Sequence, residues 1–143
     1  MVYIPITLGP GAVAPAYGAP GDAGADLRST ERVLIPAGGH SIVPTGVAIQ
    51  LAPGTAGFVY SRSGLAAKNG VFVLNAPGLI DSGYRGELKV ILANFGADDF
   101  LVEVGDRIAQ LVVQEVIRPH FHEVEVLDST QRGALGFGST GIR

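Results

Sequence analysis

Short runs of apolar and β-branched residues recur along the chain, and each run ends near Gly, Pro, Asn or Asp. This spacing predicts many short strands, as in an all-β sandwich or barrel, and does not fit alternating strands and helices. The predicted strands cover residues 3–8, 33–35, 41–43, 47–51, 58–60, 71–74, 87–95, 100–104, 107–117 and 120–127.

Three segments depart from this strand pattern. Residues 63–70 predict one short helix, because Ser63 can cap its start and Gly70 can end it. Residues 75–87 predict a strand, a tight turn and a returning strand. After Leu127 the apolar periodicity stops. We therefore expect a β core over residues 1–127 and a C-terminal arm over residues 128–143 that is mobile without ligand.

Composition narrows the class of protein. The 143 residues suffice for one domain, and 21 Gly and 9 Pro beside 47% hydrophobic residues disfavour both disorder and a helical bundle. A net charge of −3 gives no electrostatic support for broad binding to nucleic acid or to anionic membranes. The chain has no Cys, no basic start followed by an apolar stretch, and no membrane-length apolar run. We expect a cytoplasmic protein.

The segment of residues 75–87 contains the first candidate site. Asn75 offers a donor and an acceptor to a planar ring, Asp81 can take a proton from water, and Tyr84 can pack against a sugar. Several glycines allow a flat ligand to approach the main chain closely. An ordinary Gly-rich hairpin with an exposed Asp is an equal alternative on this segment alone.

The C-terminal segment of residues 132–141 combines groups that bind phosphate with one that stacks on bases. Arg132 can form bidentate bonds to phosphate, Ser139 and Thr140 add donors, and Phe137 offers an aromatic face. The alternative is a disordered Gly/Ser tail, which is the commoner explanation for an arbitrary chain. The presence of Arg132 and Phe137 favours a functional segment over a disordered tail.

Other polar residues suggest weaker sites. Arg62 and Ser63 would lie at the start of the short helix, where an anion is favoured, although simple capping is equally possible. Asp26 would suit an outer contact to hydrated Mg²⁺, but an Asx turn is the commoner explanation. Gln110 follows a turn and enters an apolar strand, so it is a candidate polar group inside a site.

The histidines give little support for a metal site. His120 and His122 share one face of a predicted strand, but His40 is distant in sequence and there is no Cys. A surface or subunit interface explains the pair better. The chain also lacks the sequence patterns of P-loop ATPases, serine hydrolases with a nucleophile elbow, and zinc proteases.

Taken together, residues 23–27, 62–66, 75–87, 105–111 and 132–141 resemble, in order and spacing, the five motifs of the trimeric dUTP pyrophosphatases (dUTPases). The resemblance spans almost the whole chain. It implies a jelly-roll-like β subunit and a homotrimer, whose active sites combine motifs from different subunits beneath a closing arm. It further implies hydrolysis of dUTP to dUMP and diphosphate, which keeps uracil out of DNA and supplies dUMP for thymidylate synthesis.

The resemblance also implies roles for individual residues. Asp81 would be the general base for in-line attack on the α-phosphorus, with Gln110 helping to place the water. Mg²⁺ would be held directly by the substrate phosphates, with Asp26 acting through coordinated water. The remaining implied substrate-binding residues are Arg62, Ser63, Gly64, Asn75, Leu79, Ile80, Tyr84, Lys89, Arg132, Phe137, Gly138 and Ser139.

These residues divide by the part of the substrate that they would contact. Asn75 and the main chain of Leu79, Ile80 and Lys89 would bind the uracil edge, in a slot too narrow for a 5-methyl group. Tyr84 would pack on the deoxyribose and leave no room for a 2′-hydroxyl.

The phosphates would have two sets of contacts. The implied contacts of the inner phosphates are Arg62, Ser63, Gly64 and Gln110. In the arm, Arg132 would meet the γ-phosphate, Phe137 would stack on uracil, and Gly138 and Ser139 would complete the phosphate cover.

Three positions depart from the family pattern. Ser61 replaces a common Pro, Gly83 replaces a common second acid, and Leu135 stands where a Gly is usual. The first two are tolerable, because neither removes a phosphate donor or the catalytic acid. Leu135 matters more, because its Cβ would penalise a positive φ in the arm, and we expect weaker ordering of the arm before lost chemistry.

Three other functions are the alternatives: a dCTP deaminase, a nucleotide sensor and a structural β-domain. A dCTP deaminase shares the hairpin pattern but needs a catalytic glutamate where this chain has Ile91, and it lacks the arm. A nucleotide sensor without turnover would need neither Asp81 as a base nor Arg132 on the γ-phosphate. In a plain structural β-domain, Arg132 and Phe137 would have no task.

Overall fold

The computed structural model describes residues 3–134 and Gly136, and this part of the chain is built mainly from short strands. One short helix, α1 (Ser63–Asn69), interrupts them. The strands are β1 (Ile6–Leu8), β2 (Ala25–Arg28), β3 (Val33–Ile35), β4 (His40–Pro44), β5 (Val47–Ile49), β6 (Thr55–Tyr60), β7 (Val71–Val73), β8 (Gly78–Ile80), β9 (Lys89–Asn94), β10 (Phe100–Val102) and β11 (Arg107–Glu115).

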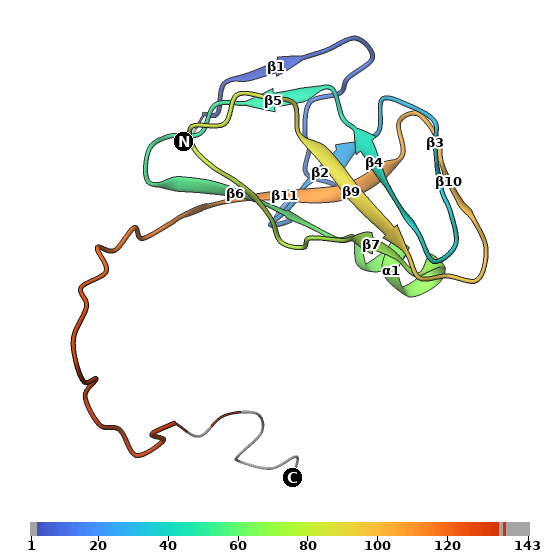
Figure 1. Cartoon of the computed structure of the whole chain (residues 1–143). Helices are drawn as coiled ribbons and strands as arrows, with labels where there is room; N and C mark the ends of the chain where they lie inside the picture. Colours follow the sequence, from blue (N-terminus) through green and yellow to red (C-terminus); the bar gives the residue numbers. More distant parts are fainter. Residues whose placement is uncertain (1–2, 135, 137–143) are drawn as a thin grey trace.

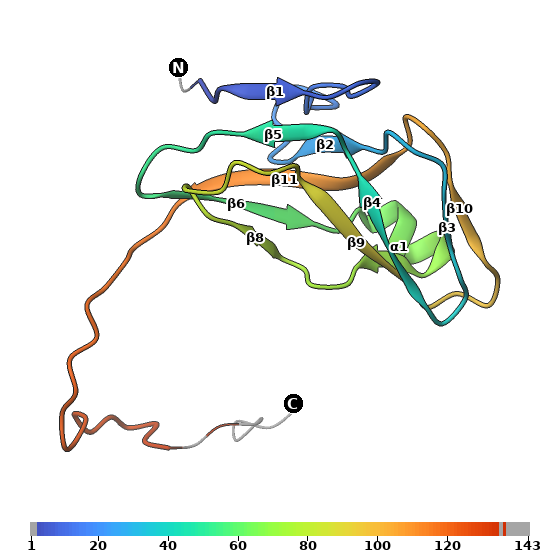
Figure 2. The ribbon, with the colours of Figure 1, turned by 45° about the horizontal axis from the view of Figure 1, so that its top comes forward.

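Two antiparallel sheets form the layers of the fold. The larger sheet has the strand order β2-β11-β6-β8, and the smaller one has the order β4-β9-β7. The pairs β1-β5 and β10-β3 extend the layers at their ends (Figures 1 and 2). The expected all-β, jelly-roll-like sandwich with one short helix is therefore confirmed, and its sheets do not close into a barrel.

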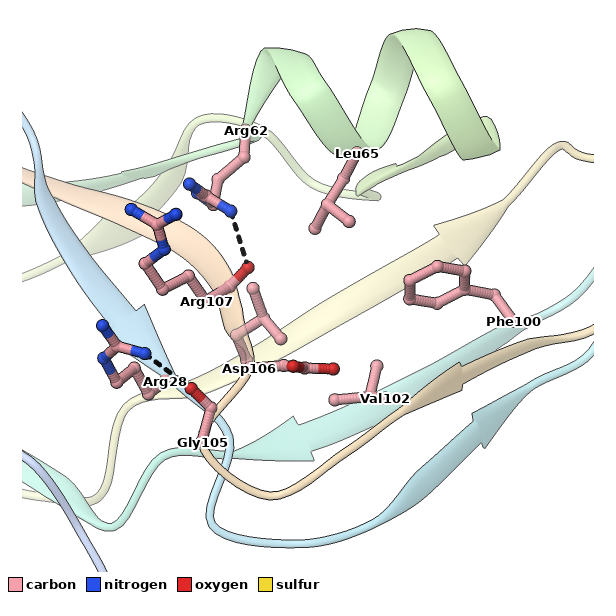
Figure 3. A pocket seen from close by; sticks show the side chains of 9 residues that line it. Arg28, Arg62, Leu65, Phe100, Val102, Gly105, Asp106 and Arg107 are labelled. Carbon is pink, nitrogen blue, oxygen red and sulfur yellow. Dashed lines mark hydrogen bonds between the residues drawn. The ribbon is translucent and has the colours of Figure 1, made fainter.

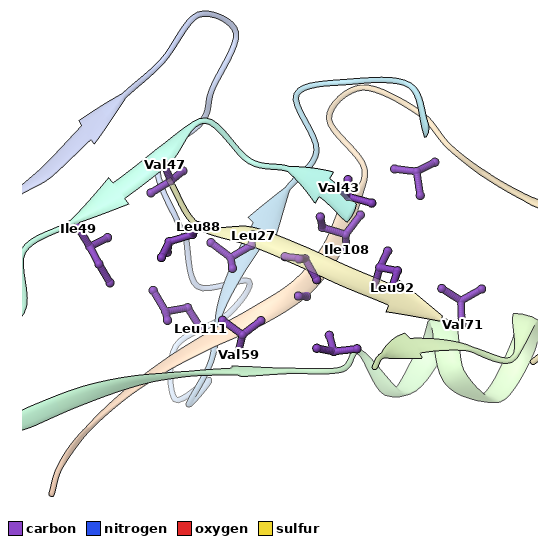
Figure 4. Packing of buried hydrophobic residues seen from close by; sticks show 14 of the residues in the cluster. Leu27, Val43, Val47, Ile49, Val59, Val71, Leu88, Leu92, Ile108 and Leu111 are labelled. Carbon is purple, nitrogen blue, oxygen red and sulfur yellow. The ribbon is translucent and has the colours of Figure 1, made fainter. Parts of the chain in front are cut away.

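The core fills the space between these layers. Branched side chains from β4, β5 and β9 meet those from β6 and β11 (Figure 4). Leu27, Leu92 and Ile108 are at most 1% exposed, and burying a side chain of this size contributes about 1.5–3 kcal/mol. In β5 the buried Val47 and Ile49 flank a half-buried Ala48, so this run forms a strand with one face inward.

The helix ends as its sequence predicts and begins differently. Gly70 has φ 68°, and its N–H donates to the carbonyl of Ala66, so a glycine in the left-handed region closes α1. The predicted cap at Ser63 is wrong. The N-cap is Arg62, whose side chain makes no capping hydrogen bond.

Every strand predicted up to residue 117 is present, although the ends differ by a few residues. β2 was not predicted, because its four residues carry no clear alternation and its pairing with β11 comes from distant sequence. The predicted hairpin over residues 75–87 is wrong. β8 pairs with β6, whereas β9 pairs with β4 and β7 in the other sheet.

The segment after β11 leaves the layered body in both views (Figures 1 and 2). The strand predicted over residues 120–127 is absent there, and its residues are exposed. A strand needs a neighbouring strand for its backbone bonds, and this segment has none within the described chain. Among the described residues, no helix is long and apolar enough to cross a membrane.

We predict that Gly70→Ala destabilises the fold more than Gly54→Ala. Both glycines have positive φ, at 68° and 82°, so each alanine costs about 1 kcal/mol in backbone strain. A Cβ on Gly70 would also lie 2.8 Å from the nitrogen of Gly96, whereas one on Gly54 has nothing within 4 Å. This overlap should cost a further 1–3 kcal/mol, roughly. Chemical denaturation at matched protein concentration measures both, and equal losses would contradict the packing argument.

Candidate active site

One row of polar side chains crosses the larger sheet. Gln110 on β11 lies opposite Asp26 on β2 and opposite Tyr60 on β6. Directly opposed residues of antiparallel strands place their side chains on the same face. Gly24 makes room for this row, since a Cβ there would lie 2.9 Å from the Cβ of Gln110. The sheet thus brings Asp26 and Gln110 together from distant parts of the sequence.

Asp26 is buried and pairs with two arginines. Its Oδ2 accepts a hydrogen bond from Nη1 of Arg107 at 3.2 Å. Nε of Arg62 lies 3.1 Å from Oδ1, which makes an ion pair without the alignment of a hydrogen bond. Asp26 is only 8% exposed and both of its carboxylate oxygens face arginines, so its side chain does not form the alternative Asx turn. Asp26 instead holds two guanidinium groups side by side.

The arginines border a pocket of about 270 Å³. Nη1 of Arg62 donates to the carbonyl of Arg107 at 3.1 Å, and Nη1 of Arg28 donates to that of Gly105 at 2.7 Å. Figure 3 shows these three arginines on one side of the pocket and Leu65 and other apolar side chains across from them. Three arginines stand against two carboxylates here, those of Asp26 and Asp106, so the excess positive charge at this end of the molecule favours an anion.

The start of α1 adjoins this cluster. Ser63 and Gly64 are exposed directly after Arg62, so they can meet the same ligand. Ser61, which departs from the common Pro, has a structural task. Its hydroxyl accepts a hydrogen bond from the backbone N–H of Val73 at 2.9 Å, which ties the segment before the helix to β7.

The second group of candidate residues lies along β8. Gly78 is buried, and a Cβ there would lie 3.4 Å from Nδ2 of Asn75, so the amide packs closely over this glycine. β8 is the last strand of its sheet, which leaves one edge of the Leu79 and Ile80 backbone unpaired by another strand. Because β7 and β9 run antiparallel, Lys89 at the start of β9 lies at the same end as the turn that holds Asn75. A planar base bound there could form hydrogen bonds with a side-chain amide and with backbone groups.

Asp81 and Tyr84 follow β8 in an exposed turn. The N–H of Tyr84 donates to the carbonyl of Asp81 at 3.0 Å and closes the turn. Nη1 of Arg85 donates to the carbonyls of Ser82 and Tyr84 at 2.7 and 2.8 Å. The carboxylate of Asp81 is therefore presented to solvent from a braced turn, which suits a group that must reach a ligand.

A single chain does not bring Asp81 to the arginine cluster. Ile80 lies opposite Gly57, which places Asp81 level with the start of β6. Arg62 follows the other end of β6, and this length of extended chain corresponds to about 20 Å. The two groups of residues would have to act on one substrate from different copies of the chain or on different parts of a long ligand.

Of the candidate residues in the arm, the structure describes Arg132 alone. Arg132 is exposed, and the segment after β11 leaves the layered body (Figure 1). Phe137, Gly138 and Ser139, together with Leu135, lie outside the described residues.

A metal would find one suitable contact near the arginines. Oδ1 of Asp26 is buried and accepts no hydrogen bond, so it can accept one from a water bound to a cation. Within the part of the chain that the structure describes, no group of three or more His, Cys, Asp or Glu side chains could hold a metal ion. His120 and His122 are both exposed and belong to no such group.

Sequence reasoning missed Arg107 as a partner of Asp26. The residue lies inside the segment of residues 105–111 that was singled out, three positions before Gln110. The signal in the sequence is its positive charge close to Gln110, which suits a carboxylate partner. A register shift in the β2–β11 pairing between Arg107 and Ala109 helps to aim it at Asp26, and sequence does not reveal that shift.

Known proteins share both the sequence and the fold. A model of the dUTPase family matches residues 11–141. The deoxyuridine 5'-triphosphate nucleotidohydrolase of Rhodococcus erythropolis is 54% identical over 135 residues, which cover 94% of this chain and 82% of that protein.

Solved structures agree. The Staphylococcus bacteriophage 80alpha dUTPase with dUPNHPP superposes with a TM-score of 0.90 at 27% identity, covering 99% of this chain and 100% of the other. A variant dUTPase from phage phi11 of S. aureus, described with a structural Mg(II) ion, gives 0.80 at 25% identity over 87% and 98% of the two chains. Since the family model matches most of the chain and the relative exceeds half identity, the chain belongs to the dUTPase family.

Proposed function

We propose that the protein hydrolyses dUTP to dUMP and diphosphate. The observation that supports this most directly is the pairing of Asp26 with Arg62 and Arg107 beside Gln110, which makes a preformed cationic site of the sign that binds phosphates. The exposed Asp81 turn supplies the base that such a reaction needs. The names of the relatives agree with this substrate.

The proposed reaction is an in-line displacement at the α-phosphorus. Asp81 accepts a proton from water, the water oxygen attacks the α-phosphorus, and the bond to the bridging oxygen breaks to release diphosphate. Gln110 helps to place the attacking water. Arg62, Ser63 and Gly64 hold the phosphates and stabilise the negative charge that develops on the leaving group.

We assign Mg²⁺ as the cofactor. When bound to the phosphates it would neutralise charge and hold them in one conformation. Asp26 fits an outer role, because its buried Oδ1 can accept a hydrogen bond from a coordinated water. The same carboxylate keeps Arg62 and Arg107 in place, so it serves the phosphate site even before the cation arrives.

Base selection would occur along β8. Asn75 and the unpaired backbone edge of Leu79 and Ile80 present donors and acceptors to the uracil edge, with Lys89 contributing main chain. Backbone groups cannot move aside for a 5-methyl group as a side chain can. Tyr84 would cover the deoxyribose and exclude a 2′-hydroxyl.

We further propose that the protein acts as a homotrimer with shared active sites. Asp81 and Arg62 lie at opposite ends of β6, so a neighbouring copy is needed to complete one site with both. The segment after β11 exposes Ile117, Phe121 and Val126 by 92%, 95% and 83%, which is unfavourable in a lone chain. Covering these side chains on another copy would explain their apolar character.

The arm would close over the substrate. Arg132 would pair with the γ-phosphate, Phe137 would stack on uracil, and Gly138 and Ser139 would cover the phosphates. Leu135 would weaken the ordering of this arm before it affected the chemistry, since its Cβ penalises positive φ. Deamination does not fit this chain, because Ile91 cannot transfer a proton.

The first test is the release of diphosphate from dUTP, beside dCTP, UTP and dTTP, with Mg²⁺ and with EDTA. We expect turnover of dUTP alone and its loss in EDTA, because Mg²⁺ neutralises the phosphates and the slot and sugar contact reject the other nucleotides. Binding of dUTP without turnover would indicate a nucleotide sensor.

Asp81→Asn should separate catalysis from binding. The amide cannot accept the proton from water, so kcat should fall by about 10²–10⁴-fold, while dUTP affinity measured by calorimetry stays close to that of the wild type. Asp98→Asn, which removes another exposed carboxylate in the β9–β10 loop, is the matched control and should retain turnover. Unchanged hydrolysis by Asp81→Asn would remove Asp81 from the mechanism.

Sedimentation equilibrium should give a mass near three times the 14.7 kDa of one chain. Phe121→Asp should weaken the assembly, because a carboxylate replaces a side chain that another copy would bury. Glu123→Gln in the same segment is the control and should leave the mass unchanged. A monomer at micromolar concentration would contradict the shared site.

A further inference from the structure

Gly86 lies against the hydroxyl end of the Tyr84 ring. A Cβ placed on Gly86 would overlap the hydroxyl oxygen of Tyr84 and would lie 2.7 Å from Cζ and 3.0 Å from Cε2 of the ring. These contacts are closer than a Cβ atom tolerates. The ring therefore occupies the space that any side chain at position 86 would need.

A hydrogen bond holds the ring in this folded-back position. The Tyr84 hydroxyl donates to the carbonyl of Glu87 at 2.9 Å. The N–H of Tyr84 donates to the carbonyl of Asp81, so the start of the side chain is positioned by the same turn that presents the base. Both ends of Tyr84 are thus tied to the chain that it covers.

The backbone below the ring is anchored to the core. Oε1 of Glu87 accepts a hydrogen bond from the N–H of Gly46 at 2.8 Å. Leu88 is 1% exposed, and its N–H donates to the carbonyl of Val47 at 2.7 Å. The backbone cannot retreat from an added methyl group, whereas the Tyr84 ring is 45% exposed and can turn outward. A side chain at 86 would displace the ring and break its bond to Glu87.

We propose that Gly86 is a specificity-determining residue for the sugar. By leaving space for the hydroxyl end of the Tyr84 ring against the chain, it sets the distance between that ring and the deoxyribose, and hence whether a 2′-hydroxyl fits. This inference rests on the proposed hydrolysis of dUTP. Gly86 acts through Tyr84 and is a positioning residue. Its φ lies outside the left-handed region, so alanine is acceptable to the backbone and acts only through the ring.

The test compares Gly86→Ala with Gly83→Ala. Gly83 belongs to the same turn, also has no left-handed φ, and has nothing within 4 Å of an added Cβ. We measure kcat and KM for dUTP and for UTP with Mg²⁺. In Gly86→Ala, kcat/KM for UTP relative to dUTP should rise about tenfold or more, mainly through a lower KM for UTP, because a displaced ring no longer excludes the 2′-hydroxyl. Gly83→Ala should keep the wild-type ratio.

Two further outcomes complete the test. Tyr84→Phe removes only the hydroxyl that bonds to Glu87, adds no volume and should shift the ratio in the same direction by a smaller factor. It decides the question if Gly86→Ala does not fold. If Gly86→Ala folds and its ratio of kcat/KM for UTP to that for dUTP is unchanged, the inference about Gly86 is wrong and the proposed function stands. If Gly86→Ala does not fold, an unchanged ratio in Tyr84→Phe has the same meaning. A wild type that does not hydrolyse dUTP overturns the proposed function and this inference with it.

Discussion

The buried carboxylate of Asp26 is the constraint on which the site depends. It joins β2 to Arg107 on β11 and to Arg62 before α1, so one side chain links three elements that are distant in sequence. An uncompensated carboxylate would be costly at this depth, and either guanidinium alone would leave one oxygen without a cationic neighbour. Stability and anion binding therefore impose the same geometry. The sheet can bury Asp26 only if both arginines are held where a phosphate could meet them.

Much of the fold follows from local sequence, and the exceptions have a common cause. Alternation within single strands and the glycine after α1 are local features, and both predict the observed elements. β2 and the partner of β8 were not predictable, because each is decided by pairing with a strand far along the chain. The wrong hairpin shows this clearly. Its two halves have suitable strand sequences, but the chain between them crosses from one sheet to the other.

Pairing between distant strands also decides which side chains of the candidate site meet. The sequence order of its segments suggested which residues belong to the site, and the structure adds which of them meet. Asp26 and Gln110 meet across the sheet, whereas Asp81 and Arg62 lie at opposite ends of β6. Spacing along the chain does not distinguish these cases, since the register of the sheet decides both. Arg107 was missed for this reason, because its role appears only once β2 lies beside β11.

The glycines of the site are explained by neighbours that sequence does not reveal. Gly24 admits the side chain of Gln110, and Gly86 admits the ring of Tyr84. In each case the missing Cβ lets a functional side chain lie close to a backbone that the sheets hold still. The position of such a side chain is therefore fixed by contact with a rigid backbone, and the glycine sets the contact distance. Discrimination between similar nucleotides depends on such distances, which is why the role proposed for Gly86 in sugar selection acts through the ring of Tyr84.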